Sequence, residues 1–249
     1  MKIALLGYGK MGRMIEEIAL SRGHEIVLKI DRDNTADLTS ENLQRADAAI
    51  EFSTPDTVLS NIDACFTAKI PVVVGTTGWY GQLQEIKNRC EDGNQSLIYG
   101  SNFSVGVNVL FRVNAYLARL MNRYPYYDVQ VEEIHHTQKL DAPSGTAMTI
   151  AEGIIDNLSE KTEWVNVVAG KTPDSAPAPA KEQLLIESLR IDKVPGTHTV
   201  IYDSEVDTIE LKHTAHSRQG FALGAVMAAE WIKDRRGFFA VTEMFDFAP

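Results

Sequence analysis

The chain begins with Met1-Lys-Ile-Ala-Leu-Leu-Gly7-Tyr8-Gly9-Lys10-Met11-Gly12, and this stretch decides the fold. The apolar run Ile3–Leu6 predicts a buried strand, and the glycines after it have the spacing G-x-G-x-x-G. Apolar residues three and four positions apart then predict a helix over Met11–Ser21. A glycine loop between a strand and a helix is typical of dinucleotide-binding units, because it lets the backbone and the helix N-terminus approach a pyrophosphate.

An acidic residue and a basic residue, Asp31 and Arg32, follow the next predicted strand and affect the choice of cofactor. Asp31 stands 19 residues after Gly12, where a carboxylate can accept hydrogen bonds from the adenosine ribose, and Arg32 follows it directly. An acid favours the free 2′-hydroxyl of NAD, whereas Arg can hold the 2′-phosphate of NADP, so NADH and NADPH both stay open. The predicted cofactor ligands in this half are Gly7, Gly9, Lys10, Met11, Gly12, Asp31 and Arg32.

Short apolar runs alternate with helical patterns through the first part of the chain. The predicted strands and crossover helices are Ile3–Leu6, Ile26–Ile30, Ala48–Phe52, Val72–Val74, Leu97–Tyr99, and the helices Met11–Ser21 and Thr57–Ala68. Such alternation favours a parallel sheet with helices on both faces. The predicted fold class is α/β, with a Rossmann-like doubly wound parallel sheet.

Two polar loops follow predicted strands, namely Ser53-Thr54-Pro55 and Gly75-Thr76-Thr77-Gly78. Ligands of open α/β sheets bind at the carboxyl ends of the strands, so small hydroxyl side chains there can approach a nicotinamide ribose or carboxamide. Each loop alone is also ordinary turn chemistry, since Ser or Thr before Pro commonly begins a helix. The pattern leaves both interpretations open.

The pattern changes after Asn102. The predicted elements there are a helix at Val107–Asn122, a strand at Asp128–Ile134, a helix near Thr146–Asn157, and strands at Gln183–Ile191, Thr197–Tyr202 and Thr208–His213. They predict a second, α+β domain with a mixed, mostly antiparallel sheet. A segment rich in Pro and small residues, Val168–Lys181, predicts a mobile loop or linker.

The predicted domain boundaries follow from these elements. Residues 1–105 form a dinucleotide-binding domain, and residues 106–217 form a domain for substrate binding and oligomerisation. A helix of small residues, Gly220–Ile232, can pack back on the first domain. Residues 218–249 are therefore expected to complete the dinucleotide-binding domain.

Titratable groups stand next to a helix start in Glu132-Glu133-Ile-His135-His136-Thr-Gln-Lys139-Leu-Asp141-Ala-Pro-Ser144-Gly145-Thr146. Adjacent histidines on a strand point to opposite faces, so at most one faces a cleft unless the strand has ended. Ser144 is a good N-cap, and amides in the first helical turn can bind a carboxylate. Lys139 adds a positive charge or a proton donor. Together they predict a site for a small anionic substrate whose reaction requires a proton beside a hydride.

Composition and charge disfavour several kinds of partner. Acidic residues outnumber basic ones by 34 to 24, and the formal net charge is −10, which argues against a nucleic-acid-binding surface. No apolar stretch reaches the roughly 20 residues of a membrane span, and the start lacks a signal-peptide pattern. We therefore expect a cytoplasmic protein with no membrane partner. Cys65 and Cys90 are far apart without a C-x-x-C motif, which predicts reduced core thiols.

A metal centre is a competing interpretation of the histidines, since His213, His216 and the His135-His136 pair could supply imidazoles. If the segment 209–216 is extended, His213 and His216 face opposite sides. No carboxylate sits at a standard ligand offset from them in the sequence. We therefore predict no metal.

At this point the residues resemble a known family. Glu133-Ile-His135-His136-x-x-Lys139-x-Asp141-Ala-Pro-Ser-Gly-Thr146-Ala is similar to the signature of the 4-hydroxy-tetrahydrodipicolinate (dihydrodipicolinate) reductases. Other motifs stand around it in the family's order: Phe52-Ser-Thr-Pro55, Gly75-Thr-Thr-Gly78, Ser101-Asn-Phe-Ser-Val-Gly106, Gly196-Thr-His198 and His213-x-Ala-x-Ser217-Arg218. The resemblance covers nearly the whole chain, and its central motif is long and specific.

The resemblance implies a role for individual residues. His135 would be the proton donor or acceptor beside the reacting ring, and Lys139 the second acid. His136, with the amides of Gly145 and Thr146, would hold the carboxylates of a small dicarboxylate substrate. The nicotinamide pocket would be lined by Gly75, Thr76, Thr77, Ser101, Asn102 and Phe103. Similar enzymes are homotetramers joined through the sheet of the second domain.

The implied reaction is the NADH- or NADPH-dependent reduction of an unsaturated six-membered ring that carries two carboxylates, on the route to diaminopimelate and lysine. Two alternatives stay open. One is another dehydrogenase of an amino-acid pathway, acting on a semialdehyde or on aspartate. The other is a non-catalytic dinucleotide-sensing protein, which has no need for His135, Lys139 and an anion-ready helix start in one stretch.

Overall fold

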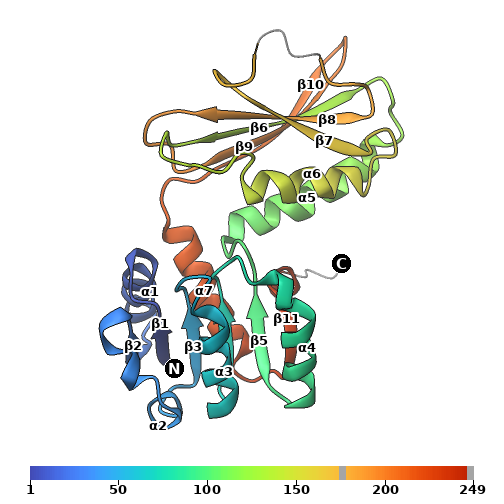
Figure 1. Ribbon diagram of the computed structural model, residues 1–249. Coiled ribbons are helices and arrows are strands. Elements are labelled where there is room, and N and C mark those ends of the chain that lie inside the picture. The colour runs from blue at the N-terminus through green and yellow to red at the C-terminus, as the bar shows by residue number, and fades with distance from the viewer. Residues whose placement is uncertain (174–177, 246–249) are drawn as a thin grey trace. The chain divides into compact units, whose positions relative to one another are not determined.

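The computed structural model describes residues 1–173 and 178–245 (Figure 1). Part of the linker predicted at 168–181 lies outside these residues. The described chain divides into two compact units. Unit 1 comprises Met1–Val105 and the residues from Arg218 onward, and unit 2 comprises Gly106–Ser217.

Unit 1 is built on a six-stranded parallel sheet with the order β11-β5-β4-β3-β1-β2. Its strands are β1 (Lys2–Leu6), β2 (Glu25–Ile30), β3 (Ala48–Glu51), β4 (Val72–Val74), β5 (Ser96–Tyr99) and β11 (Gly237–Ala240). The predicted doubly wound α/β fold is confirmed. The inner strands are apolar throughout because both faces of the sheet are buried.

Helices cover both faces of this sheet, and each face has its own core. Alternate residues of β1 point to opposite sides: Ala4 and Leu6 pack in one core, and Ile3 and Leu5 in the other. The first core includes residues of α2 (Ser40–Leu43), α3 (Val58–Ala68) and α4 (Leu83–Asp92). The second includes residues of α1 (Lys10–Ser21), α7 (Gln219–Ile232) and α8 (Val241–Met244). The late helix α7 therefore packs in unit 1, as predicted.

Several elements of unit 1 were not predicted from the sequence. Helix α4 buries only Ile86 and Cys90 among its ten residues, which is too weak an apolar stripe to stand out. Strand β11 has four residues and is defined by its pairing with β5, far away in the sequence. The short helices η1 (Arg32–Asp37), η2 (Tyr80–Gln82), α2 and α8 were also missed. The predicted strands and helices differ from the observed ones by one or two residues at their ends.

Unit 2 contains a five-stranded mixed sheet with the order β10-β9-β6-β8-β7. Its strands are β6 (Asp128–His135), β7 (Glu163–Val168), β8 (Gln183–Arg190), β9 (Thr197–Asp203) and β10 (Thr208–Thr214). The β10-β9 and β9-β6 pairs are antiparallel, whereas β6-β8 and β8-β7 are parallel. The sheet is mixed as predicted, but its antiparallel share is half rather than most, because β7 was not foreseen.

Two helices, α5 (Val105–Met121) and α6 (Gly145–Ile155), lie on one face of this sheet (Figure 1). Their residues form the core of unit 2 with inward-facing residues of the strands, such as Val131, Ile186 and Val200. The opposite face carries half-buried residues, among them Glu132 and Leu185. The core face positions the end of β6, where Glu133 and His135 point the same way.

Two further expectations concern the cysteines and membrane spans. Cys65 and Cys90 are both free thiols in the core of unit 1, as predicted. Burial raises the pKa of the Cys90 thiol to about 11, so this thiol is unreactive at neutral pH. Among the described residues, the helices are all too short or too polar to cross a membrane.

Candidate active site

The glycine loop of unit 1 has the geometry that its spacing predicts. Gly7 has φ +96°, and a Cβ there would lie 2.1 Å from the carbonyl oxygen of Phe52. A Cβ on Gly12 would lie 2.3 Å from the carbonyl oxygen of Gly7, so this glycine lets α1 meet the loop. Apart from Gly9 itself and its neighbours in the chain, no described residue has an atom within 4 Å of a Cβ placed on Gly9, which leaves room for a ligand at the helix N-terminus.

A cavity of about 800 Å³ opens beside this loop. Four predicted cofactor residues line it: Gly7, Gly9, Asp31 and Arg32. The carboxylate of Asp31 accepts a hydrogen bond from the amide of Arg32 at 2.9 Å and caps η1, which holds it at the end of β2. The volume is in the range of cofactor and ligand sites. The loop and the acid are therefore brought together as one surface.

A second hollow, of about 250 Å³, lies at the ends of β3 and β4. It is lined by Met11, Gly75, Thr76 and Thr77 of the predicted set, together with Phe52, Ser53 and Pro55. The predicted residues Lys10, Gly12, Ser101, Asn102 and Phe103 line neither this hollow nor the larger cavity. The side chain of Phe103 is 1% exposed and belongs to the core, so it can contribute to a pocket only through its backbone.

A buried acid, Glu51, contacts residues that line the two hollows and was not predicted as a site residue. Its Oε1 accepts hydrogen bonds from the amide and hydroxyl of Ser53 and, at 3.2 Å, from the side-chain amide of Asn61. The amide of Ser53 also donates to the hydroxyl of Thr76 at 2.8 Å. Burial raises the pKa of the Glu51 carboxyl, although these hydrogen bonds oppose the shift. Glu51 thus ties together the loops after β3 and β4.

Other lining residues were also missed by the sequence reasoning. The larger cavity is bordered by Thr35 and Leu38 after β2 and by Thr57, Ser60 and Asn61 at the start of α3. Their sequence resembles ordinary helix capping, which hid them. A signal for Glu51 was present, namely a single charged residue inside the apolar strand Ala48–Glu51. A lone acid in a strand buried on both faces is unusual enough to mark a functional position.

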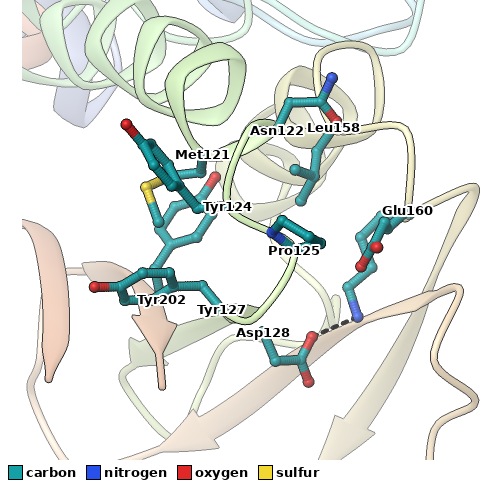
Figure 2. A pocket seen from close by; sticks show the side chains of 10 residues that line it. Met121, Asn122, Tyr124, Pro125, Tyr127, Asp128, Leu158, Glu160 and Tyr202 are labelled. Carbon is teal, nitrogen blue, oxygen red and sulfur yellow. Dashed lines mark ion pairs between the residues drawn. The ribbon is translucent and has the colours of Figure 1, made fainter. Parts of the chain in front are cut away.

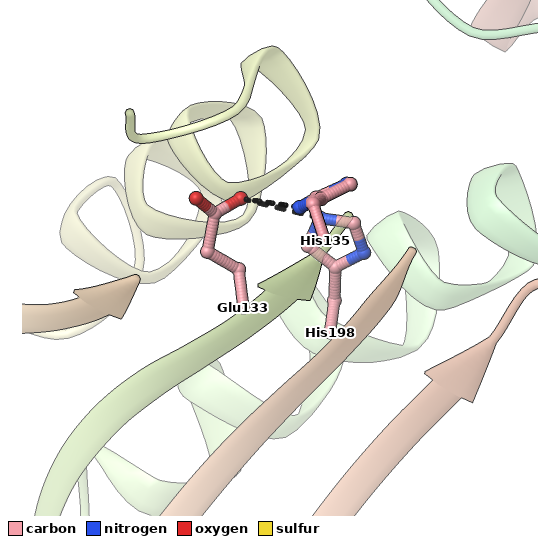
Figure 3. Close-up of side chains that lie close together, drawn as sticks. All are labelled: Glu133, His135 and His198. Carbon is pink, nitrogen blue, oxygen red and sulfur yellow. Dashed lines mark ion pairs between the residues drawn. The ribbon is translucent and has the colours of Figure 1, made fainter. Parts of the chain in front are cut away.

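In unit 2 the predicted cluster forms at the end of β6. His135 is the last residue of that strand and is 8% exposed, whereas His136 follows the strand and is half-buried. Nδ1 of His135 lies 3.2 Å from Oε2 of Glu133, and the ring of His198 packs edge-on against His135 at 5.1 Å between centroids (Figure 3). The two histidines of the pair therefore have different environments, as the strand geometry predicts.

Glu133 is completely buried and accepts hydrogen bonds from three directions. Its Oε2 accepts from the amide of Ser144 at 3.1 Å, and its Oε1 accepts from Oγ of Ser188 at 2.8 Å and from Arg190 at 3.0 Å. Burial by itself would raise the pKa of the Glu133 carboxyl. The contacts with His135, Ser144, Ser188 and Arg190 outweigh burial and hold that pKa well below its usual range. Glu133 is therefore an anion at any working pH.

His198 joins the cluster from β9 and carries no charge at neutral pH. Its Nε2 lies 3.0 Å from Oγ of Ser144, the residue that caps α6. Burial, followed by the nearby His135, lowers the pKa of His198 to about 3. His213, its cross-strand neighbour on β10, also has its pKa lowered by burial. Both rings thus add polar contacts without adding positive charge.

The remaining predicted residues lie in the loop after β6 and at the start of α6. Nζ of Lys139 forms an ion pair with Asp141 at 2.7 Å, and Arg190 donates to the carbonyl oxygen of Asp141 at 2.7 Å. Gly145 and Thr146 are the first residues of α6, and Ser144 accepts a hydrogen bond from the amide of Ala147 at 3.2 Å. The predicted N-cap is confirmed. The positive end of the helix dipole therefore lies beside the histidine cluster.

The structure differs from the sequence-based expectation about metal ligands. The sequence placed no carboxylate at a ligand offset from the histidines, but the structure brings Glu133, His135 and His198 together, with ligand atoms within 4.8 Å of one another. Glu133 lies two positions before His135 on the same strand face, and His198 comes from a neighbouring strand. Both oxygens of Glu133 already accept hydrogen bonds, and the Arg190 guanidinium disfavours a cation. The absence of a metal stays a prediction.

A small cavity elsewhere in unit 2 offers no room for a substrate. It has a volume of about 20 Å³ and lies between Tyr124, Asp128 and Tyr202 (Figure 2). Lys161 closes one side, with its Nζ 2.7 Å from Asp128 and 2.8 Å from the carbonyl oxygen of Lys181. A cavity of this size holds about one water molecule. This cavity therefore plays no part in the candidate site.

The fold and the two sets of residues define a class. A doubly wound domain with a glycine loop and an acid after the second strand, followed by an α+β domain with a cluster of buried titratable residues, is typical of a pyridine-nucleotide-dependent reductase. Sequence families agree with this class. The family model "Dihydrodipicolinate reductase, N-terminus" matches residues 1–103, and "Dihydrodipicolinate reductase, C-terminus" matches residues 106–245.

Individual relatives extend the match over the whole chain. A 4-hydroxy-tetrahydrodipicolinate reductase of Christiangramia forsetii is 47% identical, over 98% of this chain and 97% of the relative. The reductase of Clostridium tetani is 33% identical, over 94% and 92%. A dipicolinate-bound dihydrodipicolinate reductase from Paenisporosarcina sp. TG-14 has the same fold, with a TM-score of 0.76 and 22% identity over 96% and 97% of the two chains.

The chain belongs to the dihydrodipicolinate reductase family. It is therefore an oxidoreductase of diaminopimelate and lysine biosynthesis, and the resemblance noted in the sequence is confirmed.

Proposed function

We propose that this chain reduces 4-hydroxy-tetrahydrodipicolinate, or the dihydrodipicolinate formed from it by loss of water, to tetrahydrodipicolinate, with NADH or NADPH as reductant. The observation that supports this most directly is the cluster at the end of β6. There Glu133, His135 and His198 lie together, beside Lys139 and the N-terminus of α6. Such a cluster can bind an anion and supply a proton, which are the two requirements of the reaction besides the hydride.

We assign the dinucleotide to unit 1. The glycine loop would hold the pyrophosphate at the start of α1, and Asp31 and Arg32 would contact the adenosine ribose. Gly75, Thr76 and Thr77 would border the nicotinamide. Ser101, Asn102 and Phe103, which follow the neighbouring strand β5, would complete that side of the pocket. Lys10, Met11 and Gly12 belong to the first turn of α1. The bound cofactor supplies the hydride.

We assign the substrate and the proton chemistry to unit 2. His136 and the amides of Gly145 and Thr146 would bind the two carboxylates, using the positive end of the α6 dipole. Hydride addition to one carbon of the ring double bond moves the electron pair of that bond onto the ring atom at its other end. His135 or Lys139 would then donate a proton there, and their positive charge would stabilise the transition state.

The test is a coupled assay with purified protein. A synthase makes the condensation product of pyruvate and aspartate semialdehyde in place, and the absorbance of NADH or NADPH is followed. We expect rapid oxidation of at least one cofactor, and the ratio of the rates reveals whether Asp31 or Arg32 governs the choice. Cofactor binding without oxidation would overturn the proposed substrate and the roles of His135 and Lys139.

Two further properties stay predictions. By analogy with the family we propose a homotetramer joined through the uncovered face of the unit 2 sheet, which carries half-buried residues such as Leu185 and Glu187. Light scattering would then give a mass four times the 27.6 kDa of one chain. A monomer mass would exclude this assembly. The cytoplasmic location expected from the sequence also stays a prediction.

A further inference from the structure

The proposed proton transfer does not explain the position of Glu133. A role for Glu133 rests on that proposed function. Its side chain is 0% exposed and lies on the same face of β6 as His135. Figure 3 shows the carboxylate pointing toward the imidazole, and Oε2 lies 3.2 Å from Nδ1. The pair is not aligned as a hydrogen bond, as is common for catalytic pairs before substrate binds.

The carboxylate is itself fixed by neighbouring elements. The Ser144 amide at the start of α6 holds Oε2, and Ser188 and Arg190 on β8 hold Oε1. These contacts engage both oxygens of Glu133 and hold the carboxylate in one orientation. A buried charge with four polar neighbours would be costly to retain for packing alone. Its orientation toward His135 therefore calls for a functional reason.

The surroundings of the imidazole point to that reason. A carboxylate beside Nδ1 favours a proton on that nitrogen and stabilises the protonated ring, so Nε2 is left to exchange a proton. On the Nε2 side stands Gly196, where a Cβ would lie 3.1 Å from that atom. Glycine thus keeps the space beside Nε2 open. The uncharged ring of His198 packs edge-on against His135 and limits its rotation.

We propose that Glu133 is a positioning residue, whose carboxylate sets the tautomer and orientation of His135 so that Nε2 faces the reactant in the space beside Gly196. The other charged or titratable groups around this ring are His198 on β9, Arg190 on β8, His213 on β10, and Lys139 and Asp141 in the loop. Of the two carboxylates in this set, Glu133 and Asp141, it is Glu133 that contacts the ring of His135.

The experiment compares Glu133→Gln and Glu133→Asp with the wild type. Gln keeps the shape but removes the charge, and Asp keeps the charge but shortens the side chain. We expect Glu133→Gln to lower kcat about 10- to 100-fold, the usual loss when a partner that orients a functional histidine is removed. KM should change less than about threefold, because in this proposal Glu133 contacts His135 and not the substrate. As pH rises, the decline in kcat should also begin at a lower pH in Glu133→Gln than in the wild type. Glu133→Asp should retain more activity than Glu133→Gln.

A role in packing alone predicts the reverse order, since the isosteric Gln would then be tolerated better than the shorter Asp. That order, or an unchanged pH profile in Glu133→Gln, would overturn the inference. Glu205→Gln is the matched control, because it makes the same change at an exposed residue of unit 2, between β9 and β10. Its kcat and pH profile should equal those of the wild type.

Two measurements keep the inference separate from folding and from the proposed function. If Glu133→Gln does not fold, the double variant Glu133→Gln with Arg190→Gln removes both buried charges and takes its place. Nitrogen-15 NMR of the histidine rings, assigned with His135→Gln, reports the His135 tautomer without turnover. We expect Nδ1–H in the wild type and a shift toward Nε2–H in Glu133→Gln. If the tautomers are as expected but the wild-type protein does not turn over the substrate, only the proposed function is refuted. If the His135 tautomer is the same in Glu133→Gln and in the wild type, the positioning role is refuted.

Discussion

At the scale of the residue, Lys139 is a candidate for proton donation whose removal can be tested cleanly. Its Nζ contacts Asp141 within the loop after β6, and it is half-buried. We predict that Lys139→Ala lowers kcat about 10²- to 10⁴-fold, the usual range for a general acid, while the Kd of NADH stays within about twofold. Steady-state kinetics and fluorescence titration measure the two quantities.

The control for this substitution is Lys87→Ala, which removes an exposed lysine from α4 in unit 1. It should leave both quantities unchanged. Equal losses of turnover and of cofactor affinity in Lys139→Ala would contradict a role in the chemical step.

Glu51 shows how a single buried acid links stability to pH. Burial raises its pKa in the folded protein above the ordinary value of a glutamate. Between these two pKa values the folded state binds more protons than the unfolded state, so this carboxyl makes the free energy of unfolding fall as pH rises. Glu51→Gln removes that contribution. We predict that the variant gains stability relative to the wild type as pH rises above the ordinary pKa range of a glutamate.

Urea unfolding at several pH values measures this difference. The absolute stability of Glu51→Gln depends on the new amide, because Oε2 of Glu51 has no hydrogen-bond partner among the described residues. The change of the free energy of unfolding with pH does not depend on the contacts of the new amide. Glu17→Gln, an exposed change on α1, should show no such slope. A difference between Glu51→Gln and wild type that does not vary with pH would disprove the account of Glu51.

At the scale of the element, α7 depends on small residues for its place in the core of unit 1. A Cβ on Gly224 would lie 1.7 Å from the carbonyl oxygen of Phe103. We predict that Gly224→Ala lowers the free energy of unfolding by about 1–3 kcal/mol or more, because the helix has to move away from the segment before α5. Gly81→Ala, where no described atom lies within 4 Å of the new Cβ, should change stability by less than about 0.5 kcal/mol. Chemical denaturation of both variants decides the matter, and equal stabilities would show that the close contact is not a constraint.

At the scale of the whole molecule, the order of the units along the chain has a consequence for cofactor binding. Unit 2 is inserted into unit 1, whose core needs α7 and β11 from the end of the chain. A ligand stabilises what it binds, by about 2.7 kcal/mol at 100 times its Kd. We predict that NADH slows hydrogen exchange in β1, β2 and α7 together, although α7 is distant in sequence from the glycine loop.

Hydrogen-exchange mass spectrometry with and without NADH tests this coupling. Peptides from α7 should gain protection along with those from β1 and β2, because the three elements share one core. Protection confined to the glycine loop would mean that unit 1 does not respond as a single cooperative body.

The sequence by itself determined what depends on neighbouring residues. Glycine spacing identified the loop at Gly7–Gly12, periodicity located most strands and helices, and Ser144 marked the start of α6, because these features reflect local backbone and side-chain geometry. The motif around His135 also identified the family. Residue by residue, the candidate ligands at Asp31 and Gly75 were found in this way.

Only the tertiary structure decided what depends on contacts between distant segments. Strands β7 and β11 exist because partners pair with them, and one of the two parallel pairs of the second sheet involves β7. Glu133 belongs to a cluster only because Arg190 and His198, more than 50 residues away in the sequence, lie beside it. The loop after β4 is connected to Glu51 by hydrogen bonds through Ser53. Such long-range hydrogen bonds leave no periodic trace in the sequence, since each partner alone looks like an ordinary polar residue.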